Sequence, residues 1–299
     1  MSPEISVVMP VWNGEAYLGE AVESILSQSF SDFEFLIIDD GSTDGTADIL
    51  NDFATKDSRI RVIRLEHQGI VNALNTGVSV ARGEWIARMD CDDIAEPTRF
   101  AKQWAAVSSK RNSVICYSSV RFIGSPEFMM PSSRIPKTRS LFALRICFHN
   151  PICHPSVIFK KSAFLDCGGY LESERHGEDF GLWGRIIQHG DVIGINEQLL
   201  NFRVHPDSIS KMESRRQQEL DHILTLKHCS LFFGCNEAAG NAIIRALRLP
   251  CERESIKEWF AFLKSWLPRF KWHSPEMLLW IFARTLKILF SGKEPIEQP

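Results

Sequence analysis

Short apolar segments alternate with amphipathic segments along the first 125 residues, and this alternation constrains the fold more than any other feature of the sequence. Four apolar segments have the length and the β-branched content of strands, at residues 5–10, 33–39, 60–65 and 84–90. Helix-like segments follow them at residues 15–28, 44–55, 69–81 and 97–109. Strands that alternate with helices predict an α/β fold, with a mostly parallel sheet flanked by helices on both faces.

Polar segments follow three of the predicted strands. They are PVWNG at 10–14, DDGSTDGT at 39–46 and DCDD at 90–93. Ligands of open parallel sheets bind beyond the carboxyl ends of the strands, so we expect one nucleotide-sized ligand to contact all three segments. Ser42, Thr43 and Asp44 can also cap the following helix without any ligand. That explanation does not account for Asp39 and Asp40.

Asp90, Asp92 and Asp93 crowd three like charges into four positions. If the extended geometry of the strand continues, the side chains of Asp90 and Asp92 point the same way. Hard divalent cations such as Mn²⁺ or Mg²⁺ prefer carboxylate oxygens and leave positions for phosphate oxygens. A helix that begins near Pro97 could explain Asp93 as a helix-start residue, but not an aspartate at the end of a buried strand. The cluster therefore predicts a divalent cation site.

Charge and cysteine content exclude several other classes of protein. The formal net charge of -3 provides no basic field, so we expect no nucleic-acid partner. The eight cysteines are scattered without a C-x-x-C pair, which argues against a zinc site and a disulfide framework. The N-terminal sequence lacks the pattern of a signal peptide. We therefore expect a cytoplasmic protein with free thiols.

The second half of the sequence is less regular. Residues 126–150 contain three prolines and a basic cluster, which indicates a connection or an excursion over the site. A strand-like segment returns at 155–160, and a helix-like segment follows at about 178–188. Since the pattern becomes helical after residue 210, we divide the chain into a catalytic domain at 1–210 and a helical C-terminal extension at 211–299.

Two long stretches resemble the family 2 glycosyltransferases with the GT-A fold. They are ISVVMPVWNGEAYLGEAVESILSQSFSDFEFLIIDDGSTDGT and GIVNALNTGVSVARGEWIARMDCDDIAEPTRFAKQ, and the resemblance extends over roughly residues 4–210. It implies a GT-A, Rossmann-like sheet and a metal-dependent transfer of a sugar from a nucleotide-sugar donor, expected to be UDP-linked. The implied acceptor is a saccharide or a lipid-linked saccharide.

The resemblance also implies roles for individual residues. Asp90 and Asp92 match the D-x-D motif that holds a divalent cation on the donor diphosphate, although Cys91 replaces a residue that is usually alanine. His205, in FRVHPDSIS with Ser208 and Ser210, matches a closing motif that reaches the metal or the diphosphate. The implied nucleotide-binding residues are Pro10, Val11, Asn13, Glu15, Asp39, Asp40, Arg88 and Asp90. Among them Asp39 and Asp40 would contact uracil and ribose, and Arg88 would lie near the phosphates.

RHGEDFGLWGRII, at 175–187, resembles the acceptor-side E-D motif of the family. It implies that Asp179 is the base that takes the proton of the acceptor hydroxyl, with Glu178 as its neighbour or as an acceptor ligand. Without the resemblance, two acidic residues at a helix N-terminus would explain the pair better. A single base without an evident nucleophile favours inversion at the anomeric carbon. His154 could belong to the acceptor site or be structural.

The segment 258–292 contains four of the eight tryptophans, interleaved with lysine and arginine. Its apolar part, 277–290, is shorter than the about 20 residues that cross a bilayer. The pattern is typical of a helix that lies on an anionic membrane surface, and a peripheral membrane contact would suit a lipid-linked acceptor. An amphipathic helix packed on the catalytic domain or in a homodimer explains it equally well.

Two alternative functions stay open. A nucleotidyltransferase would need a basic, glycine-rich phosphate loop after the first strand, and PVWNGEAY does not supply one. A non-catalytic nucleotide-sugar-binding assembly subunit could retain the fold, but Asp90, Asp92 and Asp179 favour an enzyme. The sequence thus favours a glycosyltransferase of surface polysaccharide or glycoconjugate biosynthesis.

Overall fold

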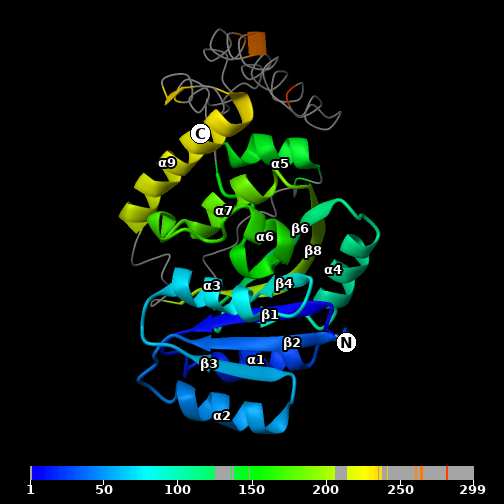
Figure 1. Ribbon diagram of the computed structural model, residues 1–299, viewed down its shortest axis with the longest axis vertical. Helices are drawn as coiled ribbons and strands as arrows, with labels where there is room; N and C mark the ends of the chain where they lie inside the picture. The colour runs from blue at the N-terminus through cyan, green and yellow to red at the C-terminus, as the bar shows by residue number, and fades with distance from the viewer. Residues whose placement is uncertain are drawn as a thin grey trace, which may run out of the picture.

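An eight-stranded sheet lies at the centre of the protein in the computed structural model (Figure 1). The strands, in their order across the sheet, are β3 (Ile60–Arg64), β2 (Phe33–Asp39), β1 (Ile5–Val11), β4 (Trp85–Arg88), β7 (Val157–Lys160), β6 (Ser113–Ile123), β8 (Asp191–Arg203) and β5 (Ile94–Ala95). Six strands run in one direction, whereas β7 and β5 run in the other. The predicted α/β fold with a mostly parallel sheet is therefore confirmed.

The structure describes most of the first 234 residues and isolated positions beyond them. The described residues are 2–124, 136, 138–147, 149–205 and 214–234, with the single positions 236, 237, 241, 260, 263, 264 and 281. Ser208 and Ser210 lie outside this set, as do most of 258–292 and residues 125–135 of the proline-containing segment. Within the described ranges, no helix is long and apolar enough to cross a membrane.

Helices cover both faces of the sheet (Figure 1). On one face lie α1 (Leu18–Leu26), α2 (Thr46–Lys56) and α4 (Arg99–Ser108). On the other lie α3 (Ile70–Val80), α5 (Arg139–Ile146), α6 (Lys161–Asp166), α7 (Glu178–Ile186) and α9 (Ser214–Phe233). Two short 3₁₀ turns, η1 (His154–Ser156) and η2 (Glu172–Glu174), precede β7 and α7.

Each face of the sheet has its own hydrophobic core. Alternate residues of β1 supply the two cores, since Val8 belongs to the core under α3, whereas Val7 and Met9 belong to the core under α1. All residues of β1 and β2 are buried. Both strands therefore read as continuous apolar runs rather than as alternating ones, as is usual for parallel strands covered on both sides.

Several predicted boundaries need correction. β4 ends at Arg88, so the extended geometry does not continue through Asp90 and Asp92, which lie in a turn. The segment 155–160 begins with η1 before β7. The strands β6 and β8 were not predicted, because register shifts interrupt their pairing and β8 has several exposed residues, so neither keeps a strict alternation.

The strand order predicts a binding crevice at the carboxyl ends of β1 and β4. The chain runs outward from β1 through β2 to β3, and then returns to the other side of β1 with β4. Such a reversal leaves the loops after the two neighbouring strands splayed apart, which is where ligands bind in open α/β sheets. The polar segments that follow β1, β2 and β4 all lie at this edge.

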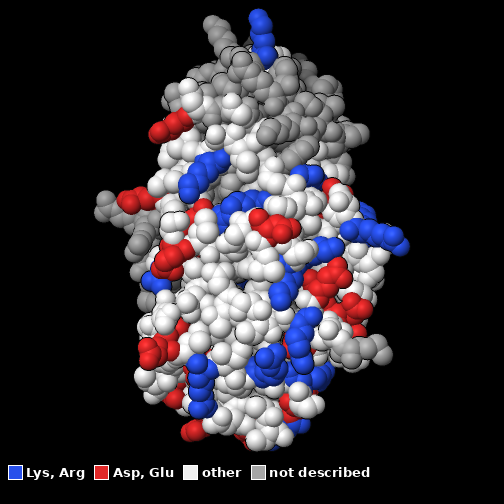
Figure 2. Space-filling model, in the orientation of Figure 1, with Lys and Arg blue, Asp and Glu red and all other residues white. Residues whose placement is uncertain are grey.

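Charged side chains at the amino ends of the strands form local pairs. Glu34 is 2% exposed and accepts hydrogen bonds from Ser6 Oγ at 2.7 Å and from Arg82 Nε at 2.8 Å. Arg61 donates to the same carboxylate at 3.1 Å. Figure 2 shows basic and acidic side chains interspersed over one face of the described part. The amino ends of β1 and β2 are thus joined to the turn that leads into β4.

Helix α9 packs directly against α7. Its residues Leu224, Cys229 and Phe232 belong to the same core as Phe180 and Trp183 of α7. His228 of α9 is 3% exposed and lies edge-on to Phe180, with ring centroids 4.7 Å apart. Close approach requires a glycine, because a Cβ at position 184 would meet the His228 ring at 2.2 Å. Helix α7 is therefore held between the sheet and α9.

We expect Gly184→Ala to lower the free energy of unfolding by about 1–3 kcal/mol, because the His228 ring is enclosed and cannot move aside without strain. Gly19→Ala is the matched control, since a Cβ at this helical glycine meets nothing within 4 Å. The control should leave stability unchanged or raise it by up to about 1 kcal/mol. Urea denaturation of the two variants measures both effects. Equal stability of the two variants would contradict the described packing.

Candidate active site

The loops after β1 and β2 are joined by reciprocal hydrogen bonds. The amides of one loop bind the side chains of the other in both directions. Three N–H groups of the first loop donate to side chains of the second at 2.9–3.1 Å, in the pairs Asn13 to Ser42, Gly14 to Thr46 and Glu15 to Asp44. Two N–H groups of the second loop donate to side chains of the first at 2.9 Å, in the pairs Thr43 to Asn13 and Gly45 to Glu15. The two predicted nucleotide-contacting segments thus form one rigid unit at the edge of the crevice.

This arrangement changes the interpretation of several predicted residues. The helix-capping explanation for residues 42–44 holds only for Asp44, whose Oδ1 accepts the N–H of Thr46, the first residue of α2, at 3.1 Å. Ser42 and Thr43 instead interact with Asn13. The side chains of Asn13 and Glu15 bind backbone amides of the second loop. Pro10 and Val11 are the last residues of β1 and are buried. Trp12, in contrast, has an exposed side chain that stacks on His67.

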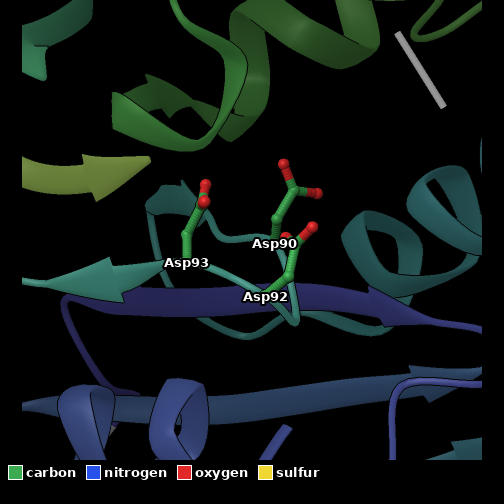
Figure 3. Close-up of side chains that lie close together, drawn as sticks. All are labelled: Asp90, Asp92 and Asp93. Carbon is green, nitrogen blue, oxygen red and sulfur yellow. The ribbon is translucent and has the colours of Figure 1, made fainter. Parts of the chain in front are cut away.

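The three aspartates of the turn after β4 lie together. One carboxylate oxygen from each of Asp90, Asp92 and Asp93 lies within 4.8 Å of the others. In Figure 3 the three side chains project from the turn on the same side. Asp93 is 1% exposed, lies six residues before α4, and is therefore not a helix-start residue as the sequence suggested. The turn, rather than an extended strand, brings the carboxylates together.

The acidic cluster contains an unsatisfied oxygen. Asp93 Oδ2 is buried and accepts no hydrogen bond within the described residues, whereas Oδ1 accepts the Arg203 N–H at 2.7 Å. Burial raises the pKa of Asp93 well above its ordinary value, and the charges of Asp90 and Asp92 raise it further. An orphaned carboxylate oxygen beside two other carboxylates matches the hard oxygen ligands that Mn²⁺ and Mg²⁺ prefer. The donor set therefore fits a divalent cation.

Arg88 compensates part of this negative charge. Its side chain is almost fully buried, and Nη1 forms an ion pair with Asp90 Oδ2. Burial disfavours the guanidinium charge, but Asp90 outweighs this effect and raises the pKa of Arg88. Burial also raises the pKa of Asp90, against the opposing charge of Arg88. Nε of Arg88 has no hydrogen-bond partner among the described residues, which is costly for a buried donor.

The end of β8 holds the acidic turn from the other side. Arg203 donates from Nε to the Asp92 carbonyl at 2.8 Å and from Nη2 to Glu20 at 2.6 Å, and its guanidinium lies over the Tyr17 ring. His205 Nε2 lies 3.0 Å from Asp92 Oδ2. The structure thus brings His205 to the acidic cluster, although 113 residues separate it from Asp92.

A buried arginine also fixes the start of the turn. Arg99 of α4 is 0% exposed and donates from Nη2 to the Arg88 carbonyl at 2.9 Å and to the Val157 carbonyl at 3.3 Å. Its Nε donates to Gln103 at 3.2 Å. Because it has no carboxylate in direct contact among these partners, burial lowers its pKa to about 9. Arg99 therefore ties β4 to β7 at the point where the chain enters the acidic turn.

Asp39 and Asp40 differ in what they bind. Asp39 Oδ1 accepts the Ser42 N–H at 2.9 Å, and Oδ2 accepts no hydrogen bond from the described residues. Both oxygens of Asp40 are occupied, by the N–H groups of Gln68 at 3.0 Å and Gly69 at 2.8 Å at the start of α3. Asp40 therefore fixes the loop after β3, and Asp39 retains an oxygen for a ligand.

Trp12 and His67 are site residues that the sequence reasoning missed. Trp12 is 53% exposed and its ring stacks on His67 at a centroid distance of 4.6 Å. His67 Nδ1 lies 3.0 Å from the Asp40 carbonyl oxygen. The sequence did contain a signal for Trp12, since a large aromatic residue directly follows a buried strand and stands between a proline and an Asn-Gly pair. Together the two rings form an aromatic platform beside Asp39.

The acidic pair at the start of α7 faces the same crevice. Asp179 is close enough that its charge helps to raise the pKa of Asp90. Burial raises the pKa of Asp179, against the hydrogen bond from Asn150 Nδ2 to Oδ2 at 2.7 Å. Burial and the charge of Asp179 raise the pKa of Glu178 to about 7, and Glu178 Oε2 accepts the His176 N–H at 2.9 Å. The pair thus has one member poised to exchange a proton near neutral pH.

His154 has a structural environment. Its Nε2 lies 2.8 Å from the Tyr170 hydroxyl, and its ring is edge-on to Trp183. Burial lowers its pKa well below the ordinary value, which keeps the ring neutral. Tyr170 in turn exchanges two backbone hydrogen bonds with the Asn75 side chain of α3. His154 therefore joins β7 to the loop before α7.

Comparison with known proteins gives a consistent assignment. A family model described as "Glycosyl transferase family 2" matches residues 6–166. The O-antigen biosynthesis glycosyltransferase WbnJ of Escherichia coli is 31% identical over 215 residues, which cover 69% of this chain and 82% of WbnJ. A match of this extent is well beyond what a single short motif provides.

Two solved structures share the fold. S. aureus TarS 1–349 in complex with UDP-GlcNAc has a TM-score of 0.65 at 17% identity, over 97% of this chain and 89% of TarS 1–349. The mannosyltransferase PcManGT of Pyrobaculum calidifontis, in complex with GDP-Man and Mn²⁺, has a TM-score of 0.58 at 16% identity, over 98% and 89% of the two chains. At these identities the likeness concerns the fold, and the predicted GT-A class is confirmed.

The raised pKa of Glu178 predicts a pH-dependent stability. The folded state binds a proton on Glu178 up to about pH 7, whereas the unfolded state releases it near 4.5. The stability from this group is therefore complete below pH 4.5 and is lost as the pH rises through 7. We expect the free energy of unfolding of the wild type, relative to Glu178→Gln, to fall by on the order of 3 kcal/mol over this window. Urea denaturation at pH 4.5 and 8 measures the difference, and a constant difference would contradict the assignment.

Proposed function

This chain belongs to glycosyl transferase family 2 and is a glycosyltransferase, and on that premise we propose that it is metal-dependent and uses a UDP-linked sugar. The acceptor would be a saccharide or a lipid-linked saccharide of surface polysaccharide or glycoconjugate biosynthesis. The single observation that carries the proposal is the cluster of Asp90, Asp92 and Asp93 at the crevice between β1 and β4. Asp179, at the start of α7, lies close enough to this cluster for its charge to act on Asp90.

Asp39 and Trp12 support a uracil base. Uracil presents one N–H donor, which matches the one oxygen of Asp39 that accepts no hydrogen bond from the described residues. Guanine presents two neighbouring donors, which would need both oxygens. The exposed Trp12 ring offers a flat face on which a base can stack. TarS binds a UDP sugar and PcManGT a GDP sugar, so a donor test must include both bases.

Asp90, Asp92 and Asp93 would hold the divalent cation, with His205 beside Asp92. When bound, the cation would neutralise charge on the departing diphosphate. Arg88 would keep Asp90 oriented, and Arg203 would keep the turn closed on Asp92. The Mn²⁺ in the PcManGT complex supports the choice of metal.

Asp179 would act as the base in a single displacement. The acceptor oxygen forms a bond to the anomeric carbon while the bond between that carbon and the β-phosphate oxygen breaks. The hydroxyl proton passes to Asp179, and the electron pair leaves with the nucleoside diphosphate. One such displacement inverts the anomeric configuration. Glu178, with its pKa raised to about 7, would bind the acceptor or share the proton.

A peripheral membrane contact or a homodimer through 258–292 stays a prediction, since this segment lies almost entirely outside the described residues. The alternative of a non-catalytic subunit is set aside, because the chain belongs to a family of glycosyltransferases.

The first experiment is a panel of UDP- and GDP-linked sugars, each assayed for hydrolysis with Mn²⁺, with Mg²⁺ and with EDTA. We expect one UDP sugar to be hydrolysed only when a divalent cation is present. Asp92→Ala should abolish both this activity and the cation-dependent part of UDP binding measured by calorimetry, since it removes a cation ligand. Lys102→Ala, at an exposed ion pair on α4, is the control and should behave as the wild type. Full turnover of Asp92→Ala would rule out the metal assignment.

Asp179→Asn tests the base. The variant keeps the size of the side chain but cannot accept the hydroxyl proton as a carboxylate does. We expect UDP binding to remain at the wild-type level and turnover to fall by roughly 10²–10⁴-fold. Donor hydrolysis, acceptor transfer and UDP affinity measured on the same preparation separate these effects. Near-normal transfer would remove Asp179 from the mechanism.

A further inference from the structure

Asn150 binds the carboxylate of Asp179 from outside its helix. Asn150 lies in the loop after α5 and donates from Nδ2 to Asp179 Oδ2 at 2.7 Å. The other oxygen, Oδ1, accepts the Phe180 N–H at 2.7 Å. Each oxygen of Asp179 therefore holds one hydrogen bond, one from its own helix and one from a loop 29 residues earlier in the chain.

The orientation of the Asn150 amide is fixed by a second contact. Its carbonyl oxygen, Oδ1, accepts the Ile152 N–H at 3.2 Å. Ile152 is 4% exposed and belongs to the core under α7. Since an amide has one acceptor end and one donor end, the bond to Ile152 turns the NH₂ group toward Asp179. The Asn150 amide is therefore held at its oxygen by the backbone of buried Ile152 and directs its NH₂ group toward Asp179.

We propose that Asn150 is a positioning residue that holds the Asp179 carboxylate in one orientation, with the remaining lone pairs of the carboxylate available to the acceptor hydroxyl. The inference rests on the proposed role of Asp179 as the base. A carboxylate bound on one oxygen alone could rotate about its Cβ–Cγ bond, and the second bond, from another element, prevents this rotation. A hydrogen bond to a charged acceptor is also among the stronger kinds in a buried site.

The same contact opposes the effect of burial on the pKa of Asp179. Burial raises the pKa of Asp179, and the hydrogen bond from Asn150 is the first of the contributions that lower it. The titratable and charged groups that face Asp179 are Arg88 from β4, Asp90 from the acidic turn, Glu178 from α7, and Cys153 and Tyr170 from the loops before β7 and α7. Asn150 acts among them without adding a charge, so replacing it isolates the hydrogen bond.

Asn150→Asp and Asn150→Ala test the proposal together in the full-length chain. Asn150→Asp keeps the shape and the acceptor for the Ile152 N–H, but it replaces the donor by a second carboxylate, and two adjacent carboxylates share one proton. Asn150→Ala removes the donor without adding a charge. The probe is the protein itself, labelled with ¹³C at the aspartate carboxyl carbons and titrated in EDTA, with Asp179→Asn identifying the Asp179 signal.

We expect the Asp179 signal to titrate at higher pH in Asn150→Ala than in the wild type, and at higher pH still in Asn150→Asp. With the donor that the panel identifies, the acid limb of kcat should move in the same order. At neutral pH kcat should fall roughly tenfold or more in both variants, with KM for the donor and the affinity for UDP unchanged. A role in shape alone would instead leave Asn150→Asp like the wild type.

An unchanged titration of Asp179 and an unchanged kcat in both variants would overturn the proposal. If Asn150→Asp fails to fold, as judged by UDP binding, Asn150→Ala decides by the same two measurements. Asp179→Asn separates this failure from a failure of the proposed function. Normal turnover of Asp179→Asn would show that Asp179 is not the base. If turnover of Asp179→Asn falls but both Asn150 variants behave as the wild type, only the role of Asn150 is ruled out.

Discussion

Three carboxylates held within 4.8 Å of one another are the constraint on which the rest of the site depends. Like charges at this distance repel, and burial adds a further penalty to Asp90 and Asp93. The surrounding structure offsets this cost with Arg88 on one side and Arg203 on the other, while Arg99 fixes the backbone where β4 ends. The site thus concentrates negative charge at the expense of local stability.

The sequence predicted the sheet and its edge well, because buried parallel strands read as apolar runs and the polar segments between them can only lie at the strand ends. It predicted that Asp90 and Asp92 lie together, but for the wrong reason, since a turn rather than a strand aligns them. The same turn also contains Asp93, which the sequence offered as a helix-start residue because a helix was expected near Pro97. A turn conformation depends on contacts from distant segments, here the β8 end, and these contacts leave no local pattern.

Other parts of the site were beyond sequence reasoning for related reasons. The reciprocal bonds between the loops after β1 and β2 use side chains that look like ordinary helix caps. Trp12 is identified by its exposure, and Asn150 by a hydrogen bond to a residue 29 positions away. Glu178 and Asp179 are recognisable as acidic residues, but their raised pKa values follow from burial in the folded structure. The roles of these residues stay proposals, whereas their positions are described.

The antiparallel strand β7 has a consequence for how the acidic turn is held. It is the strand that joins β4 to β6, so the hydrogen bonds of the sheet pass from β1, β2, β3 and β4 to β6, β8 and β5 through its four residues. The acidic turn follows β4 on one side of this strand, whereas Arg203 and His205 lie at the end of β8 on the other side. Their contacts with Asp92 therefore join the two parts of the sheet a second time. A substitution that loosens β7 would thus disturb the acidic turn without changing any residue of it.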